Sequence, residues 1–252
     1  MKRTKRLLTM LLTLVLCVGE ISATGLKVFA ADEKTITGLG TGAITDPVVL
    51  DDIYESWSGS FVYYGKYNGS DPTIYRVLDK DSYEFGVPGE GLFLDCDDTL
   101  FQAAHGRLVT EWKNSCIKWL LNGDGFLKKA GNFTAVEEDA IAESTKGSGT
   151  GALCGEKIFC LSEKEACSTK YGYLSGIDSS SLSKGGSWWL RDIREWANGG
   201  YYGSFINSQG QIMFPTDPGS AMDFEAGVSP AFNISLSSII SSTLVSGESG
   251  KT

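Results

Sequence analysis

The first 30 residues constrain the fold most, because they combine a positively charged N-terminus, an apolar run and small residues at the positions that precede a cleavage site. Two lysines and two arginines lie within the first six residues, and residues 7–18 are almost wholly apolar. Val28 and Ala30 stand three and one positions before Ala31, as signal peptidase prefers. The pattern predicts a secretory signal peptide over residues 1–30, cleaved after Ala30, so that only the chain from Ala31 onward folds.

Two alternatives to a cleaved signal are weaker. An uncleaved membrane anchor is disfavoured because an apolar run of about a dozen residues is shorter than the roughly 20 that cross a bilayer. A lipoprotein signal wants a small residue immediately before its cysteine, whereas Leu16 precedes Cys17. No later segment is long and apolar enough to span a bilayer. We therefore expect a secreted or extracellular protein without a membrane span after cleavage, with cell-surface association left open.

Charge limits the partners of the mature chain. Of the 252 residues, 222 follow the signal peptide, which is enough for one domain with a substantial core. The signal peptide carries five Lys or Arg and one Glu, so its removal changes the net charge from −9 to −13. A chain this acidic repels nucleic acid and anionic lipid. We expect no nucleic acid among the partners, and we interpret the acidity as favouring solubility outside the cell.

Cysteine and histidine usage indicates no metal and no cofactor. Five cysteines follow the signal peptide: Cys96, Cys116, Cys154, Cys160 and Cys167. An odd number leaves at least one thiol unpaired in a monomer, and the spacing does not fix any pairing. Because no C-x-x-C is present and the one histidine, His105, is distant in sequence, a metal site is disfavoured. We expect His105 to be a loop or packing residue and not a general base.

An acidic cluster offers the only other metal-like pattern. Asp95, Asp97 and Asp98, with Asp81, supply the hard oxygens that Ca²⁺ prefers, but they lack the spacing of an EF-hand. We expect a solvated acidic turn there.

Hydrophobic patterning predicts an α+β domain over residues 53–242, between a polar leader (31–52) and a flexible Ser/Gly tail (243–252). Strands are expected, with turn-forming residues between them, at 61–64, 73–78, 91–94, 157–161, 187–191, 201–206, 211–214 and 227–234. A helix is expected over 108–121 from its apolar spacing, and Thr134 with Glu137 forms a capping box for a helix through Ala142. Ser162 with Glu165 caps a further short turn. We expect a twisted, mostly antiparallel sheet with two or three flanking helices.

Aromatic residues at and just before the strand predicted at 201–206 are the candidate binding residues. Trp196, Tyr201 and Tyr202 lie in a Gly-rich loop, where binding and packing are equally expected. Trp188 and Trp189 alternate along a strand and are expected mainly in the core. Arg191 is expected either to anchor an Asp or Glu in the core or to contact a ligand. The predicted ligand-binding residues are therefore Trp196, Tyr201, Tyr202 and Arg191, and no catalytic motif is found.

Several segments together resemble the uncharacterised DUF6273 family, over about residues 60–242. They are Phe-Val-Tyr-Tyr-Gly-Lys-Tyr at 61–67, Tyr-Arg-Val-Leu at 75–78, Trp-Lys-Asn-Ser at 112–115, Ser-Trp-Trp-Leu-Arg at 187–191 and the closing segment 227–236. The resemblance implies an exported or surface-attached protein of a Gram-positive bacterium, often joined to other extracellular modules. The closing segment is also similar to C-type-lectin-like and formylglycine-generating-enzyme-like domains, which implies a C-type-lectin-like fold.

This chain departs from the family pattern at two places. Asp192-Ile193 stands where the family has Ser-Pro, and Ser229 stands where it has an arginine. If that arginine pairs with an acid in relatives, this chain has lost the pair.

Three functions remain open from the sequence. The first is an exported, non-catalytic extracellular binding module for a glycan or a protein, acting through residues 194–202, and it is preferred. The second is a structural or spacer module of a surface protein. The third is an enzyme of the formylglycine-generating type, which needs a reactive cysteine pair. Neither the ligand nor the oligomeric state follows from the sequence.

Overall fold

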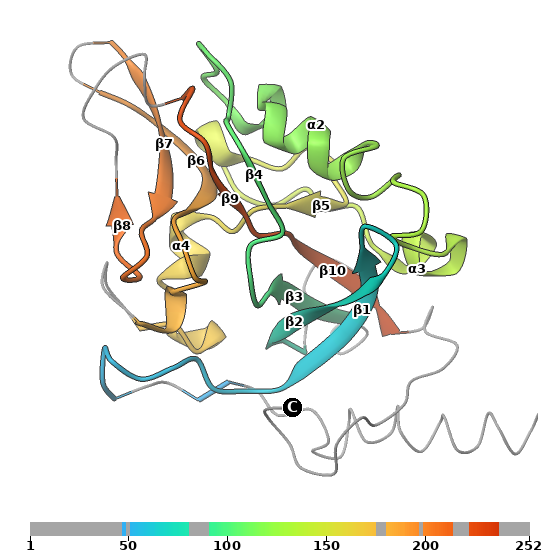
Figure 1. Cartoon of the computed structure of the whole chain (residues 1–252). Helices are drawn as coiled ribbons and strands as arrows, with labels where there is room; N and C mark the ends of the chain where they lie inside the picture. The colour runs from blue at the N-terminus through green and yellow to red at the C-terminus, as the bar shows by residue number, and fades with distance from the viewer. Residues whose placement is uncertain are drawn as a thin grey trace, which may run out of the picture.

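The computed structural model describes residues 47–48, 51–80, 91–174, 180–196, 199–213 and 222–236. The predicted signal peptide, most of the polar leader and the Ser/Gly tail lie outside the described residues. The fold is α+β, as predicted, but it contains two five-stranded sheets where we expected one. Figure 1 shows β6, β7 and β8 on one side of the molecule and β1, β2 and β3 on the other.

The first sheet is entirely antiparallel and contains the predicted meander. Its strands, in spatial order, are β1 (Phe61–Tyr67), β2 (Asp71–Asp79), β3 (Gly91–Cys96), β10 (Ala231–Ser235) and β5 (Ile158–Phe159). Asn68 and Gly69 both have positive φ between β1 and β2, and Ser70 N donates to Tyr67 O. Asn-Gly tolerates this conformation at both central positions, so it forms the tight turn that a hairpin needs.

The second sheet carries the aromatic strands. Its strands, in spatial order, are β4 (Phe101–Ala103), β9 (Ala226–Val228), β6 (Trp188–Glu195), β7 (Tyr201–Ile206) and β8 (Ile212–Met213). β7 and β8 form the predicted hairpin, in which Asn207 Oδ1 accepts hydrogen bonds from Gln209 N and Gln211 N. Among the strands that the structure describes, only β6 and β9 pair in parallel.

Two chain segments pass from one sheet to the other at the same place. β3 leads into β4, and β9 leads into β10 through Ser229-Pro230, a path that is visible as the red ribbon in Figure 1. The sequence predicted one strand over 227–234. It is split because Pro230 has no N–H to donate, and its carbonyl instead accepts from Cys96 N at 2.8 Å. Residues 95–99 and Ser229 therefore lie at the junction of the two sheets.

Helices are short and lie against both sheets. They are η2 (Trp112–Asn114), α2 (Cys116–Asn122), α3 (Ala135–Ala140), η3 (Gly149–Gly151), α4 (Glu163–Ala166), η4 (Thr169–Tyr171) and η5 (Ser180–Leu182). Both predicted capping boxes are present, at Thr134 with Glu137 and at Ser162 with Glu165. α3 ends before Ala142 because the chain there leaves the helix to pair with β10, where Ala142 N donates to Asn233 O.

The helix predicted over 108–121 begins later than expected. Leu108 has a left-handed backbone (φ 62°) and an 85% exposed side chain, so it neither continues a helix nor joins the core. The α-helical part starts at Cys116, where the Ser115 side chain accepts a hydrogen bond from Ile117 N.

Both neighbouring tryptophans of β6 are core residues, as expected. They point to opposite faces of the strand, yet both are fully buried because the sheet is covered on both sides. The Trp188 indole donates to Leu182 O at 2.9 Å, and the Trp189 indole donates to Ala103 O at 2.7 Å.

His105 is a packing residue, as predicted. Its Nδ1 lies 3.1 Å from Ser115 Oγ and its Nε2 lies 3.2 Å from Leu190 O, and its ring packs edge-on against Trp189. Leu190 O can only accept, so Nε2 carries the proton of the neutral ring. Burial lowers the pKa of His105 to about 4.

Candidate functional site

The predicted aromatic loop does not form one exposed surface. Trp196 is 57% exposed and Tyr201 is partly exposed, whereas Tyr202 is only 2% exposed. Tyr202 packs edge-on against the Trp196 ring at 6.2 Å and faces the interior because successive residues of β7 alternate between faces. Binding and packing were equally expected for Tyr202, and the structure shows packing, so its place among the predicted ligand-binding residues is corrected. Because Trp196 contacts Tyr202, whereas Tyr201 points to the other face of β7, the three rings do not share one surface.

Arg191 is the core anchor and not a surface contact. Its side chain is buried, donates to Gly151 O and Cys160 O at 2.9 Å each, and forms an ion pair with Glu165. Burial alone would raise the pKa of Glu165, but Arg191 and Lys146 outweigh it and lower that pKa to about 2. Of the two roles predicted for Arg191, the anchor of a core Glu is confirmed, and the role of ligand contact is corrected because its donors are used inside the protein.

The five cysteines form no disulfide within the described residues. Cys96 and Cys160 are buried, and burial raises the pKa of each thiol to about 12. Cys116 and Cys154 are exposed and Cys167 is partly buried. A reactive thiol needs a lowered pKa, so Cys160 does not suit the cysteine pair that a formylglycine-generating enzyme uses.

The acidic cluster is not the solvated turn that the sequence suggested. Asp95 is fully buried and accepts hydrogen bonds on Oδ2 from Lys184 Nζ at 2.6 Å and from Tyr173 Oη at 2.7 Å. Asp97 pairs with Arg76, and Asp98 Oδ1 accepts from Thr99 N. Asp81 lies outside the described residues. Among the described residues, no group of three or more His, Cys, Asp or Glu is arranged to hold a metal ion.

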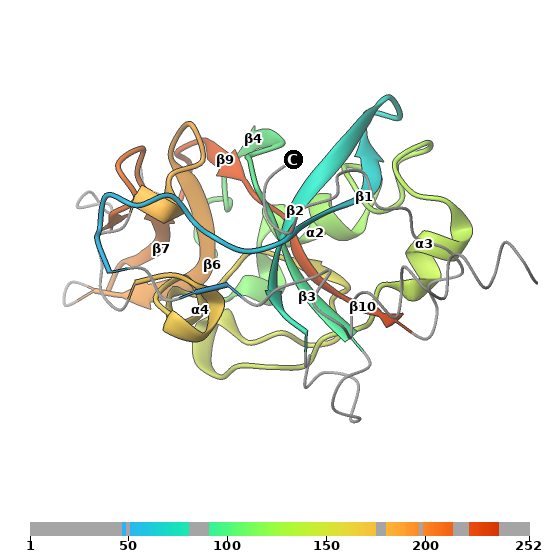
Figure 2. The ribbon, with the colours of Figure 1, turned by 90° about the horizontal axis from the view of Figure 1, so that it is seen from below.

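The Arg76–Asp97 pair lies in a surface pocket of about 340 Å³. Four chain segments meet there: the stretch before β1, β1 with β2, the turn after β3, and the region of η5. The lining residues are Ser56, Trp57, Phe61, Ile74, Arg76, Asp97, Ser180, Ser181 and Ser183. In Figure 2 the blue stretch that leads into β1 crosses the face of the molecule that the view presents.

Hydrogen bonds fix the stretch before β1 as one wall of the pocket. Ser180 N donates to Ile53 O at 2.7 Å, and the Ser180 hydroxyl donates to Glu55 O at 2.7 Å. The Trp57 indole donates to Tyr171 O at 2.9 Å. These bonds join segments more than 100 residues apart, so the wall is held in place by tertiary structure.

Arg76 is the central charged group of the pocket. Its Nε donates to Asp97 Oδ1 at 2.7 Å, its Nη1 donates to Ser181 O at 2.5 Å, and its guanidinium lies 5.6 Å from the centre of the Trp57 ring. Burial by itself would lower the pKa of Arg76, but the neighbouring Tyr173, Asp97 and Asp95 outweigh it and raise that pKa. The guanidinium is therefore a permanently charged, pre-oriented group.

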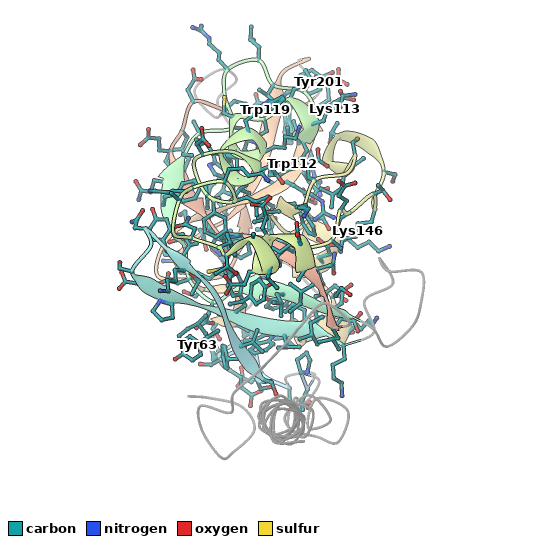
Figure 3. All side chains as sticks on the ribbon, turned by 90° about the vertical axis from the view of Figure 1, so that its right-hand side faces the viewer. Tyr63, Trp112, Lys113, Trp119, Lys146 and Tyr201 are labelled. Carbon is teal, nitrogen blue, oxygen red and sulfur yellow. The ribbon has the colours of Figure 1, made fainter. Side chains whose placement is uncertain are left out.

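This pocket and the aromatic loop are separate places. Figure 3 shows Tyr201 at one end of the molecule and Tyr63, on the strand that contributes Phe61 to the pocket, at the other end. Sequence reasoning missed the pocket because no local motif marks it. In the sequence Arg76 looks like an ordinary strand residue, because its hydrogen-bonding partners come from distant segments.

Comparison of the chain with family models, with curated proteins and with solved structures gives no match. Within the part of the chain that the structure describes, no helix has the length and apolar character needed to cross a membrane.

Proposed function

We propose that the protein is an exported, non-catalytic extracellular binding module, and that the pocket at Arg76 and Asp97 is its ligand site. The observation that carries the proposal is a concave site that combines an apolar wall with a fixed, paired charge. Specific ligand sites are typically concave, partly apolar and equipped with a few fixed polar groups. The ligand class is a glycan or a protein met outside the cell.

The chemistry of the lining supports binding over catalysis. The hydroxyls of Ser180 and Ser183 donate to backbone carbonyls, so neither is paired with a base that would activate it as a nucleophile. His105, the one histidine of the chain, is buried in the core, and its ring nitrogens lie against Ser115 and Leu190. Arg76 and Asp97 hold each other and are fixed in position.

The binding site is tested by filling the pocket. The mature chain, residues 31–252, is screened against a glycan array and against immobilised extracellular proteins, and hits are compared between two variants. Ser56→Trp places a large side chain in the pocket from an exposed position, and we expect it to abolish binding. Trp196→Ala removes the exposed aromatic of the other loop, and we expect it to leave binding unchanged. The reverse pattern, or no bound partner in either screen, refutes the proposal.

Export has its own test. The positive start and apolar run of residues 1–30 support secretion, with cleavage after Ala30. Expression of the full chain in a Gram-positive host should yield extracellular protein whose first residue is Ala31, as measured by N-terminal sequencing. Retention of residues 1–30 on a membrane-bound protein contradicts it.

A further inference from the structure

The polar groups of the pocket are strongly biased towards hydrogen-bond acceptors. The Ser180 hydroxyl donates its proton to Glu55 O, and the Ser183 hydroxyl donates its proton to Ser208 O. A hydroxyl has only one proton to give, so towards the pocket each of these oxygens offers lone pairs alone. Two of the serine side chains that line the pocket can therefore accept a hydrogen bond from a ligand.

Asp97 adds a charged acceptor. Its Oδ1 is used by Arg76 Nε, whereas its Oδ2 has no hydrogen-bonding partner among the residues that the structure describes. The side chain keeps 39% of its surface exposed, so this oxygen is open to a ligand. Charge-assisted hydrogen bonds to a carboxylate are about twice as strong as neutral ones.

Arg76 contributes few free donors to balance these acceptors. Two of its nitrogens donate inward, to Asp97 and to the Ser181 carbonyl, and only a small part of the residue is exposed. Its charge is compensated by Asp97, with Asp95 behind it. An anionic ligand would meet the Asp97 carboxylate without gaining free guanidinium donors, so the pocket disfavours anions.

We infer that the pocket binds a sugar residue with a free, protonated amino group, with the ammonium at Asp97 Oδ2 and ring hydroxyls donating to Ser180 and Ser183. This inference rests on the proposed function and names its ligand class. The apolar lining from Trp57, Phe61 and Ile74 suits the C–H groups of a sugar ring. The mature chain, with its net charge of −13, also attracts a cationic saccharide.

A lysine side chain is the other common source of an ammonium group, and the pocket fits it less well. A lysine ammonium carries three N–H donors, but the alkyl chain behind it has no other polar group and is narrower than a sugar ring. It would therefore cover less of the apolar wall formed by Trp57, Phe61 and Ile74. An amino sugar combines the ammonium with a broad ring and with hydroxyl donors that the alkyl chain lacks.

The decisive experiment compares two saccharides that differ only at the amine. Titration calorimetry at mildly acidic pH measures a glucosamine oligosaccharide against the N-acetylglucosamine oligosaccharide of equal length. Acetylation removes the charge, so we expect binding to weaken about tenfold or more. The preference should shrink as salt is added, because it is electrostatic.

Variants assign the preference to one oxygen. Asp97→Asn should abolish most of the preference for the amine, whereas Asp98→Asn, the same change at the neighbouring exposed carboxylate, should leave it intact. Circular dichroism confirms that both variants fold. Should Asp97→Asn fail to fold, Ser183→Ala replaces it, with an expected loss of several-fold in affinity for the amine-bearing sugar.

Three outcomes overturn the inference. Equal affinity for the two saccharides leaves the pocket as a glycan site but rejects the amine. A lysine-rich peptide that displaces the glucosamine oligosaccharide at equal concentration assigns the site to a protein ligand. Binding of neither saccharide rejects the amino sugar, while the binding module itself stands or falls on the Ser56→Trp comparison.

Discussion

Lys184 Nζ lies 2.6 Å from Asp95 Oδ2, and both side chains are completely buried. All three protons of the ammonium are used, because Nζ also donates to Cys96 O at 2.6 Å and to Ser229 Oγ at 2.8 Å. Asp95 is the residue before the last of β3, and Ser229 lies between β9 and β10, so the pair joins the two sheets where the chain passes between them. Burial lowers the pKa of Lys184, and the adjacent Asp95 opposes that shift.

Replacing Lys184 by methionine should destabilise the protein by about 3–5 kcal/mol, because it removes the cation that hydrogen-bonds to the buried Asp95 carboxylate. Urea unfolding of the mature chain measures the loss. Lys164→Met makes the same change at an exposed position and should alter the free energy of unfolding by less than about 0.5 kcal/mol. A Lys184→Met variant as stable as Lys164→Met contradicts a structural role for the pair.

An arginine at position 229 should rescue part of this loss. Ser229 Oγ lies 3.5 Å from Asp95 Oδ1, so a longer cationic side chain from this position reaches the same carboxylate once Lys184 is shortened. We expect Ser229→Arg to destabilise the otherwise unchanged chain, where two cations would crowd Asp95, but to stabilise a Lys184→Ala background. Urea unfolding of the two single variants and the double variant forms the cycle. Additive effects refute the compensation.

That compensation bears on the resemblance to the DUF6273 family, which stays a prediction. If the family arginine at the position of Ser229 pairs with an acid in relatives, this chain has lost that pair. The structure places Asp95 beside Ser229 and supplies the positive charge from Lys184, which is 45 residues away along the chain. Asp95 therefore has a buried cation beside it, although no local pattern around Lys184 could have shown this.

Local features of the fold were predictable from the sequence. The two capping boxes and the Asn-Gly turn depend on residues within a few positions of each other, so sequence spacing predicts them. Most strand locations followed from β-favouring runs for the same reason, but β4 was not predicted. The helix over 108–121 was predicted to begin too early, since apolar spacing does not reveal that Leu108 adopts a left-handed backbone.

Long-range features were not predictable in this way. The division into two sheets depends on how strands pair, and the split at Pro230 becomes visible only when Cys96 is known to lie opposite. The pocket forms only because Arg76 and Asp97 lie beside the stretch before β1, which hydrogen bonds from Ser180 hold in place. Core packing and ligand binding stayed open for Tyr202 and Arg191, because the sequence alone does not reveal what covers them.

Lowering the pH from 6.5 to 4 should destabilise the protein through His105. Its folded pKa of about 4 lies below the ordinary value of 6.5, so the unfolded chain binds the proton more readily between these values. The stability that the neutral ring contributes is fully present above pH 6.5 and is lost as the pH falls towards 4, by about 3 kcal/mol. Urea unfolding measured between these pH values checks the slope.

His105→Gln is the control for that window. Glutamine retains a donor and an acceptor but does not titrate, so the pH dependence between 6.5 and 4 should flatten. Glu165 contributes separately, since its folded pKa of about 2 lies below 4.5 and its stabilisation is lost only as the pH falls from 4.5 towards 2. An unchanged slope in His105→Gln assigns the acid sensitivity to another group.

The aromatic loop offers a last contrast, between a ring inside the protein and one outside it. Tyr202 is only 2% exposed, so Tyr202→Ala leaves a cavity and should cost about 3–5 kcal/mol in urea unfolding. Trp196 is 57% exposed, so Trp196→Ala should cost less than about 1 kcal/mol, mainly through its edge contact with Tyr202. Because that contact joins the two rings, the double variant should cost less than the sum of the single changes. Equal losses of unfolding free energy for the two single variants would show that the loop packs differently. Trp196 would then be covered, and the loop that joins β6 to β7 would offer no exposed ring to a ligand.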